Sequence, residues 1–193
     1  MISELLQRSS LFSLLHRIDR DLSEEHRQKR CPVCGGPLHQ SNYPRKARGG
    51  PDDLPEEILI RQSFCCGREG CRVRSLPPSC LFMGRRVYWG VVILVVMTLR
   101  QGRPEGRSTI WLQRTFGISR KTLFRWIGYF RDVFPHHVSW KRVRGRVGAS
   151  IKDHELPGGL VELFLEQVED AEEALAGCLR LLATGQGGFY QAL

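Results

Sequence analysis

The residues best suited to chemistry in this sequence are cysteines, which occur in two close groups. Cys31 and Cys34 lie in RCPVCGGPLHQ, where a Gly-Gly pair follows the second cysteine. Thiolates at this spacing can bind one metal ion while backbone amides point at the sulfurs, and glycine allows the tight turn. Cys66 and Cys71 follow in FCCGREGCR, at a wider spacing that zinc ligands also use. Together the four cysteines predict one tetrahedral site for a single structural Zn²⁺.

The third ligand and the metal itself leave alternatives open. Cys65 lies beside Cys66, and we prefer Cys66 because its shorter span to the last cysteine resembles a knuckle loop. His39 could instead complete a site of three cysteines and one histidine. An iron centre of rubredoxin type is the main competitor, but it normally pairs two Cys-x2-Cys knuckles, and the basic charge suits nucleic acid better than electron transfer. Cys80 and Cys178 have no close partner in the sequence and are expected to pack.

A second group of residues is suited to binding DNA. The stretch STIWLQRTFGISRKTLFRWIGYF, residues 108–130, indicates two short helices joined by a turn at Gly117, the pattern of a helix-turn-helix. Ser119 is placed to cap the second helix. An apolar stripe on that helix is expected to face the core: Leu123, Trp126, Ile127 and Phe130. The opposite side carries the predicted DNA contacts: Arg120, Lys121, Thr122 and Arg125.

The distribution of charge favours DNA binding over a purely structural helical hairpin. Residues 100–146 contain twelve Lys or Arg and two acids, whereas an ordinary solvated face mixes both signs. Residues 1–150 carry 27 basic and 12 acidic side chains, and residues 151–193 carry 2 and 8. The basic part is expected to meet phosphate and the acidic part to stay away from it. Beyond the hairpin, further predicted phosphate or minor-groove contacts are Lys141, Arg142, Arg144 and Arg146, for which a solvated linker is the alternative.

The elements that must position these residues follow in order along the chain. Residues 1–29 indicate an amphipathic helical segment, either one helix or two broken near Ser9 and Ser10. Residues 30–80 indicate a zinc-ribbon module with a long internal loop, in which residues 58–64 alternate like a strand. A nearly continuous apolar run predicts a buried helix over residues 86–101, which completes a trihelical helix-turn-helix domain over 86–131. The expected fold class is mainly α with a small β zinc ribbon and with N- and C-terminal helices.

The rest of the chain is predicted to be a basic linker or arm over residues 132–157 and an acidic amphipathic helix over residues 158–184. The apolar stripe of that helix requires a surface to cover. Three alternatives remain: a homodimer seam through residues 160–182, a contact with another protein, or a lid on the N-terminal helix. Its acids show no strand pattern, so we expect a solvated face and no catalytic carboxylates.

No stretch of the sequence suits a membrane or a secretory signal. The longest apolar run, residues 91–97, is shorter than the roughly 20 residues that a spanning helix needs. The apolar residues near the N-terminus are too few for a signal peptide. We therefore expect a cytoplasmic bacterial protein associated with the nucleoid, in which the seven cysteines are reduced and close pairs bind metal.

The order of CPVCGG, FCCGREGCR, RSLPPS, GRRVYWG and FGISRKTLFRW resembles the DNA-recognition part of bacterial insertion-sequence transposases and of their accessory proteins. The resemblance covers about residues 31–131. It implies a four-thiolate zinc site at the four cysteines named above and recognition-helix contacts at residues 120, 121, 122 and 125. Such transposases also carry three carboxylates on a ribonuclease-H-like sheet, and residues 151–193 leave no room for that fold.

These observations predict a zinc-containing protein that binds double-stranded DNA and belongs to a mobile genetic element. Its role would be that of a transposition accessory factor or repressor without a catalytic domain, so we expect no enzyme activity. A transposase or another protein is an expected partner. Two alternatives are a catalytic subunit or fragment of a nuclease or strand transferase completed by a partner, and a protein-binding adaptor in a transcription or antiphage complex.

Overall fold

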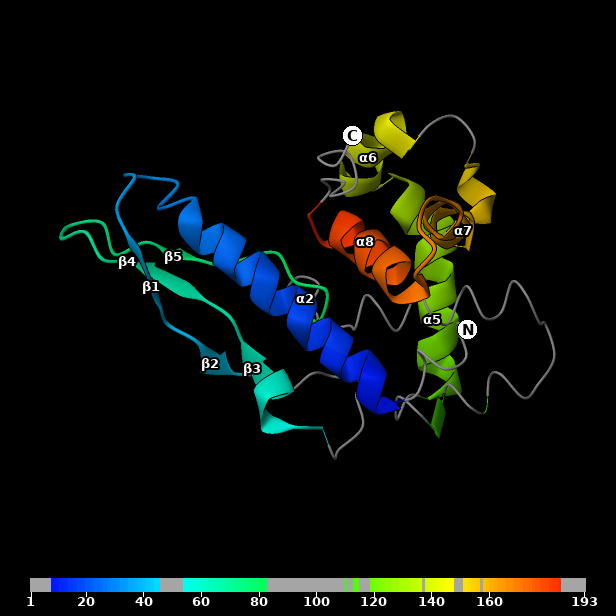
Figure 1. The fold of residues 1–193 in the computed structure, drawn as a ribbon, viewed down its shortest axis with the longest axis horizontal. Helices are drawn as coiled ribbons and strands as arrows, with labels where there is room; N and C mark the ends of the chain where they lie inside the picture. Colours follow the sequence, from blue (N-terminus) through cyan, green and yellow to red (C-terminus); the bar gives the residue numbers. More distant parts are fainter. Residues whose placement is uncertain are drawn as a thin grey trace.

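The computed structural model describes residues 8–45, 54–82, 110, 113–114, 119–136, 138–147, 151–156 and 158–184 (Figure 1). These residues form five α-helices and two small antiparallel sheets. The expected combination of helices with a small β part is confirmed at this level. A long N-terminal helix links the sheets at one end of the molecule to the C-terminal helices at the other (Figure 1).

Helix α2, Arg8–Gln28, packs against both the β part of the chain and the last helix that the structure describes. Leu11, Leu15, Ile18 and Leu22 recur at helical spacing, and all are buried. The helix continues through Ser9 and Ser10, and the residues before Arg8 lie outside those that the structure describes. It ends where Arg30 adopts a left-handed φ of 61°, immediately before the first cysteine.

The strands of the larger sheet bring the two cysteine groups together. Strand β1, Leu38–Gln40, pairs antiparallel with β4, Phe64–Cys66, which pairs in turn with β5, Arg74–Ser75. Strand β2, Tyr43–Pro44, pairs with β3, Ile60–Arg61, in a second sheet. The register of β1 on β4 places Leu38 opposite Cys66.

The single strand expected over residues 58–64 is not continuous. Residues Glu56–Leu59 form the 3₁₀ helix η1, and the chain bends between β3 and β4, which belong to different sheets. Polar Arg61 and Ser63 are buried, and so is Phe64 directly after Ser63, so the alternation of inward apolar and outward polar residues fails here.

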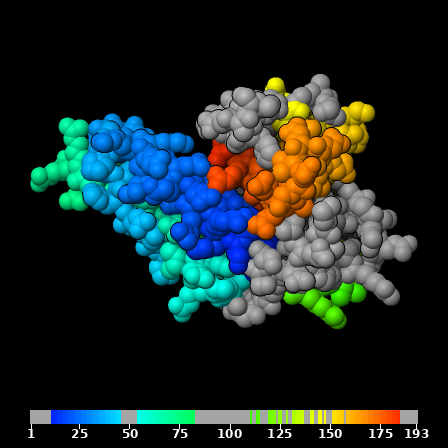
Figure 2. All heavy atoms as spheres, viewed as in Figure 1, coloured from blue at the N-terminus to red at the C-terminus, as the bar shows by residue number. Residues whose placement is uncertain are grey.

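The acidic segment forms two helices, α7, Gly158–Gln167, and α8, Ala171–Thr184, where one helix was expected. Asp170 lies between them and caps α8, because its Oδ1 accepts hydrogen bonds from the N–H groups of Glu172 and Glu173 at 2.6 and 3.2 Å. The two helices pack against each other, and α8 also packs on α2 (Figure 2).

Ion pairs reinforce the contact between α8 and α2. Arg180 binds Asp21 and Glu25 at 2.5 and 2.8 Å, and Arg17 binds Glu172. The apolar stripe of α8 lies in the same core as that of α2. Of the three alternatives for this stripe, the intramolecular lid on the N-terminal helix is confirmed. A homodimer through residues 160–182 stays a prediction.

The segment expected to be a basic linker or arm contains a packed helix. Helix α5, Arg120–Gly128, runs into the π-helical η2, Tyr129–Val133, and the 3₁₀ helix η3, Phe134–His136, after which α6 spans Val138–Val147. Trp140 on α6 is buried beside Phe134 and donates its indole N–H to Asp153, in η4, Asp153–Glu155, at 3.2 Å. This buried tryptophan is what anchors a segment whose charge pattern had suggested solvation.

The described residues contain two hydrophobic clusters of unequal size. The larger one joins α2 to α7, α8 and Trp140. The smaller one consists of Cys31, Leu38, Phe64 and Cys66, and the partly buried Cys34 and Cys71 pack against it. The smaller cluster has few apolar side chains, so the thiols themselves form much of it.

Some predictions concern residues outside those that the structure describes. These include the buried helix over residues 86–101, most of the first helix of the proposed helix-turn-helix, and the turn at Gly117. The side chains of the apolar stripe on α5 are likewise outside this set. Of the helices in the described ranges, none combines the length and apolarity needed to cross a membrane.

Candidate metal centre

The first cysteine pair lies in a tight turn directly after α2. The N–H of Gly35 donates to the carbonyl of Cys31 at 2.9 Å, and the N–H of Cys31 donates to the carbonyl of Gly36 at 2.9 Å. Gly35 has a φ of 70°, a conformation that glycine adopts without a steric penalty. A Cβ at Gly36 would lie 3.0 Å from the Cys66 sulfur and 3.3 Å from the Cys34 sulfur, so this glycine also lets the sulfurs approach.

The second cysteine pair is held by the loop between β4 and β5. The N–H of Cys66 donates to the carbonyl of Val73 at 2.9 Å, and the N–H of Gly67 donates to the carbonyl of Pro37 at 2.9 Å. The N–H of Cys71 donates to the carbonyl of Arg68 at 3.1 Å. These bonds close the second turn and tie it to the first.

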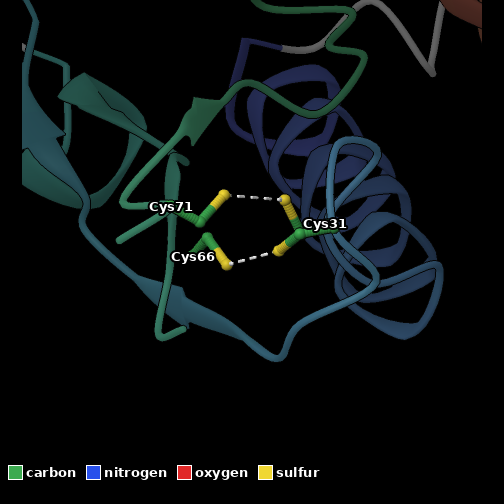
Figure 3. A group of neighbouring side chains, drawn as sticks. Cys31, Cys66 and Cys71 are labelled. Atoms are coloured by element: carbon green, nitrogen blue, oxygen red, sulfur yellow. Dashed lines mark hydrogen bonds between the residues drawn. The ribbon is translucent and has the colours of Figure 1, made fainter. Parts of the chain in front are cut away.

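The four cysteine sulfur atoms form one compact group. The Sγ atoms of Cys31 and Cys71 are 3.8 Å apart, and those of Cys34 and Cys66 are 3.5 Å apart (Figure 3). All four Sγ atoms lie within 4.8 Å of one another. The structure thus brings together all four cysteines that the sequence predicted, from two knuckles on different elements.

This donor set fits a single metal ion. Tetrahedral coordination with Zn–S bonds of about 2.3 Å requires sulfurs separated by about 3.8 Å. Two of the separations, 3.5 and 3.8 Å, lie close to this value, and the limit of 4.8 Å for the others requires only small side-chain adjustments. Four soft thiolates also exclude the hard cations Ca²⁺ and Mg²⁺ as natural occupants.

Backbone amides prepare the sulfurs for a metal. The N–H of Gly36 points at the Cys34 sulfur and is the main reason that the pKa of this thiol falls to about 7. The N–H of Arg68 donates to the Cys66 sulfur at 3.4 Å and lowers its pKa, but burial and the neighbouring thiols outweigh this effect and raise it to about 12. A metal ion must therefore displace protons from the cluster, as is usual for thiolate sites.

The other ligand candidates lie outside the cluster. Cys65 points its thiol at the carbonyls of Cys66 and Arg72, at 3.8 and 3.6 Å. His39 is exposed on β1 and does not belong to the group of converging ligand atoms. The preference for Cys66 agrees with this arrangement, because alternate residues on a strand point to opposite faces.

The two remaining cysteines are buried, as expected. Cys178 is fully buried in α8. The thiol of Cys80 donates to a carboxylate oxygen of Asp19 at 3.1 Å, and the N–H of Cys80 donates to the same oxygen at 2.7 Å. Ser79 also donates to Asp19. The end of the metal module is thus tied to α2.

The predicted DNA contacts on α5 lie where a ligand can reach them. Arg120, Lys121 and Arg125 are exposed, and Thr122 is half-buried. Ser119 caps the helix as predicted, because its Oγ accepts a hydrogen bond from the N–H of Thr122 at 3.2 Å. The start of α5 therefore presents cations and the positive end of a helix dipole on the same side.

The basic residues of α6 have different environments. Lys141 is exposed, whereas Arg144 forms an ion pair with Asp153 at 3.5 Å. The side chains of Arg142 and Arg146 lie outside the described set. The structure places these residues on a helix and not on an extended arm.

Sequence reasoning missed two features of the metal module. The first is Arg68, whose guanidinium donates to the carbonyl of Cys34 at 3.2 Å and thereby joins the two knuckles. The second is Asp19, which is buried on α2 and accepts hydrogen bonds from Ser79 and Cys80 at the end of the module. An arginine inside a knuckle loop is a signal that could have been noticed, but nothing in the sequence near Asp19 indicates its distant partners.

Comparisons of the chain with models of protein families, with curated proteins and with solved structures found no match. The function must therefore be argued from the geometry of the site and from the charges around it.

Proposed function

We propose that this chain is a zinc-containing, double-stranded-DNA-binding protein of a bacterial mobile element, acting as a transposition accessory factor or repressor. In this proposal the four thiolates hold one structural Zn²⁺ in a zinc-ribbon module. Helix α5 is the second helix of a helix-turn-helix and reads bases in the major groove. The protein recruits or represses a transposase and performs no catalysis itself.

The observation that carries the DNA-binding part is the exposed start of α5. Arg120, Lys121 and Arg125 project from the first two turns of a helix whose N-terminus is capped by Ser119. A recognition helix contacts bases mainly with its N-terminal residues, and arginine is the side chain that most often reads guanine. The surrounding excess of positive charge supports the same partner.

The arrangement of acids supports a binding role over a nuclease. Within the described ranges, the cysteine cluster is the one group in which three or more potential metal ligands converge. Asp170 caps α8, and Glu172 pairs with Arg17. Asp170 and Glu172 thus have structural roles in the helices that carry them.

The decisive experiment is selection of bound fragments from a random pool of duplex DNA, followed by titration of variants on the selected fragment. Arg120→Ala together with Arg125→Ala should weaken binding by about 1–3 kcal/mol for each base contact and relax the selected sequence. A control variant, Arg20→Ala with Lys152→Ala, removes the same charge from exposed positions elsewhere and should bind normally.

Metal content is measured on the same preparation, and about one zinc per chain is expected. Failure of the wild-type protein to enrich any duplex would reject the proposed function. Equal affinity of the wild type and the α5 variant would reject α5 as the reading helix.

A further inference from the structure

We propose that the metal module is itself a second DNA-binding surface, which grips the phosphate backbone of the duplex beside the site read by α5. This inference rests on the proposed function, but it assigns a role to residues outside α5 and α6. The surface consists of five basic residues around the thiol cluster, here called the knuckle cations: Lys29, Arg30, Arg68, Arg72 and Arg74.

The knuckle cations are placed together by the same contacts that assemble the cluster. Arg30 directly precedes Cys31 and Arg72 directly follows Cys71, and the sulfurs of these two cysteines are 3.8 Å apart. Lys29 adjoins Arg30 at the end of α2. The segments that carry them, the end of α2 and the β4–β5 loop, lie together at one end of the molecule (Figure 1).

The other two cations belong to the same region. Arg68 donates to the carbonyl of Cys34, so it lies across the junction of the two knuckles. Arg74 lies opposite Cys65 in the sheet. Residues 29–40 and 64–75 together contain these five basic residues and one acid, Glu69. The charge around the cluster is therefore strongly one-sided.

The knuckle cations lack the carboxylate partners that several other arginines of the described chain have. All five are exposed, and in the part of the chain that the structure describes none of them forms an ion pair. By contrast, Arg17 pairs with Glu172 and Arg27 pairs with Glu24. Arg180 pairs with both Asp21 and Glu25. Positive charges that gather on one surface without carboxylate partners favour an external polyanion.

The side chains around the cluster favour a duplex over a single strand. Proteins that bind single strands stack bases on exposed aromatic rings. In the described part of the module Phe64 and Phe82 are buried and Tyr43 is half-buried. Cations without exposed Phe, Tyr or Trp can neutralise phosphates but offer no platform for bases, which is the chemistry of duplex backbone contacts.

A bound metal ion would hold the knuckle cations in their positions on this surface. Arg30 and Arg72 both have left-handed backbone conformations, with φ of 61° and 47°, next to cysteines of the cluster. A residue other than glycine adopts this conformation only when its surroundings hold it there. The cluster is the feature that fixes both positions, so loss of the metal should release the cations together with the sulfurs.

The test compares two full-length variants with equal loss of charge. The knuckle variant carries Lys29→Gln, Arg30→Asn and Arg72→Asn, where asparagine is chosen because it tolerates the left-handed backbone. Arg68 is retained because of its bond to Cys34. The control variant carries Arg17→Gln, Arg27→Gln and Arg180→Gln, which removes cations that already have acidic partners. Zinc content and thermal unfolding are measured for both variants to check that the fold is intact.

Affinities for the selected duplex, for a random duplex and for a single strand are measured from 50 to 300 mM salt, roughly the range over which counterion release dominates. For the knuckle variant we expect at least about a tenfold loss on both duplexes and a salt dependence smaller by about two to three ions, with the selected sequence unchanged. The control variant should match the wild type.

Equal salt dependence of the knuckle variant and the wild type would overturn this inference, and so would an equal loss in the control variant. Tighter binding of the single strand, reduced by the same substitutions, would also overturn it in favour of single-stranded nucleic acid. In each of these cases a wild type that still selects a duplex leaves the proposed function standing. A wild type that binds no duplex rejects the proposed function as well.

Discussion

Cys65 and Cys66 are neighbours in the sequence, but only Cys66 belongs to the thiol cluster. We predict that Cys66→Ser lowers the zinc content well below one per chain, because the site loses one of its four thiolates and a serine hydroxyl is a poor replacement ligand. Cys65→Ser should retain the metal, since its thiol contacts backbone carbonyls. Elemental analysis after gel filtration measures both. Metal loss from the Cys65 variant with retention in the Cys66 variant would exchange the two assignments.

Asp19 provides a pH-dependent contribution to stability. Burial is the main cause of its raised pKa, despite the hydrogen bonds from Ser79 and Cys80. Between its ordinary value of 3.8 and the raised pKa the folded chain binds more protons than the unfolded chain. The free energy of unfolding therefore decreases as the pH rises through this window. In Asp19→Asn, which cannot titrate, this part of the pH dependence should disappear.

Chemical denaturation across acidic pH tests this prediction through the difference between the variant and the wild type. Glu56→Gln, at an exposed position, is the control and should leave the profile unchanged. Parallel pH profiles for Asp19→Asn and the wild type would contradict the prediction, because they would show that the Asp19 carboxyl has the same proton affinity in the folded and unfolded chain. Asp19→Ala should cost roughly 2–3 kcal/mol near neutral pH, because it leaves buried donors without an acceptor.

At the scale of elements, substitutions at Ser119, the cap of α5, distinguish effects on helix stability from effects on DNA binding. Ser119→Ala removes the acceptor for the Thr122 N–H and should destabilise α5 by about 1 kcal/mol. Ser119→Asp retains the acceptor and a favourable charge at the helix N-terminus, so α5 should stay stable. Its added negative charge should nevertheless weaken binding to a duplex, because it would face phosphates.

Hydrogen exchange of α5 and affinity for the selected duplex measure the two effects separately. The alanine variant should exchange faster with a modest loss of affinity, and the aspartate variant should exchange normally with a larger loss. Unchanged DNA affinity for Ser119→Asp would place the start of α5 away from the bound duplex.

For the whole molecule, the two hydrophobic clusters predict a two-part response to metal removal. The smaller cluster contains the thiols and few other apolar groups, whereas the larger one joins α2 to the C-terminal helices. Chelation should therefore expose the backbone amides of the metal module, including those of Cys31, Cys66 and Gly67, which are protected by hydrogen bonds. The amides of α8 should stay protected.

Hydrogen exchange with and without a chelator tests this response, and restored zinc should return the protection. Salt at matched ionic strength is the control. Loss of protection throughout α8 as well would mean that the two clusters unfold as one cooperative unit. Unchanged exchange in the metal module would show that hydrogen bonds alone hold the knuckles.

The local features of this protein were predictable because their physical causes lie within a few residues. The Cys-Pro-x-Cys-Gly spacing predicted the first knuckle, and Ser119 ahead of an apolar period predicted the start of α5. Alternation predicted the strand over residues 58–64 poorly, since Arg61 is buried and donates to the carbonyl of Pro77 at 2.7 Å. The partner that makes its burial tolerable is distant in the chain.

What the sequence determined by itself was the ligand set, the charge asymmetry and the helical stripes. Only the tertiary structure decided that α8 covers α2, that Trp140 anchors a basic segment, and that Asp19 receives hydrogen bonds from residues 60 and 61 positions away. The reason is that knuckles and caps are closed by bonds between near neighbours, which spacing encodes directly. A buried stripe or carboxylate specifies that it needs a partner but not which distant residue will provide it.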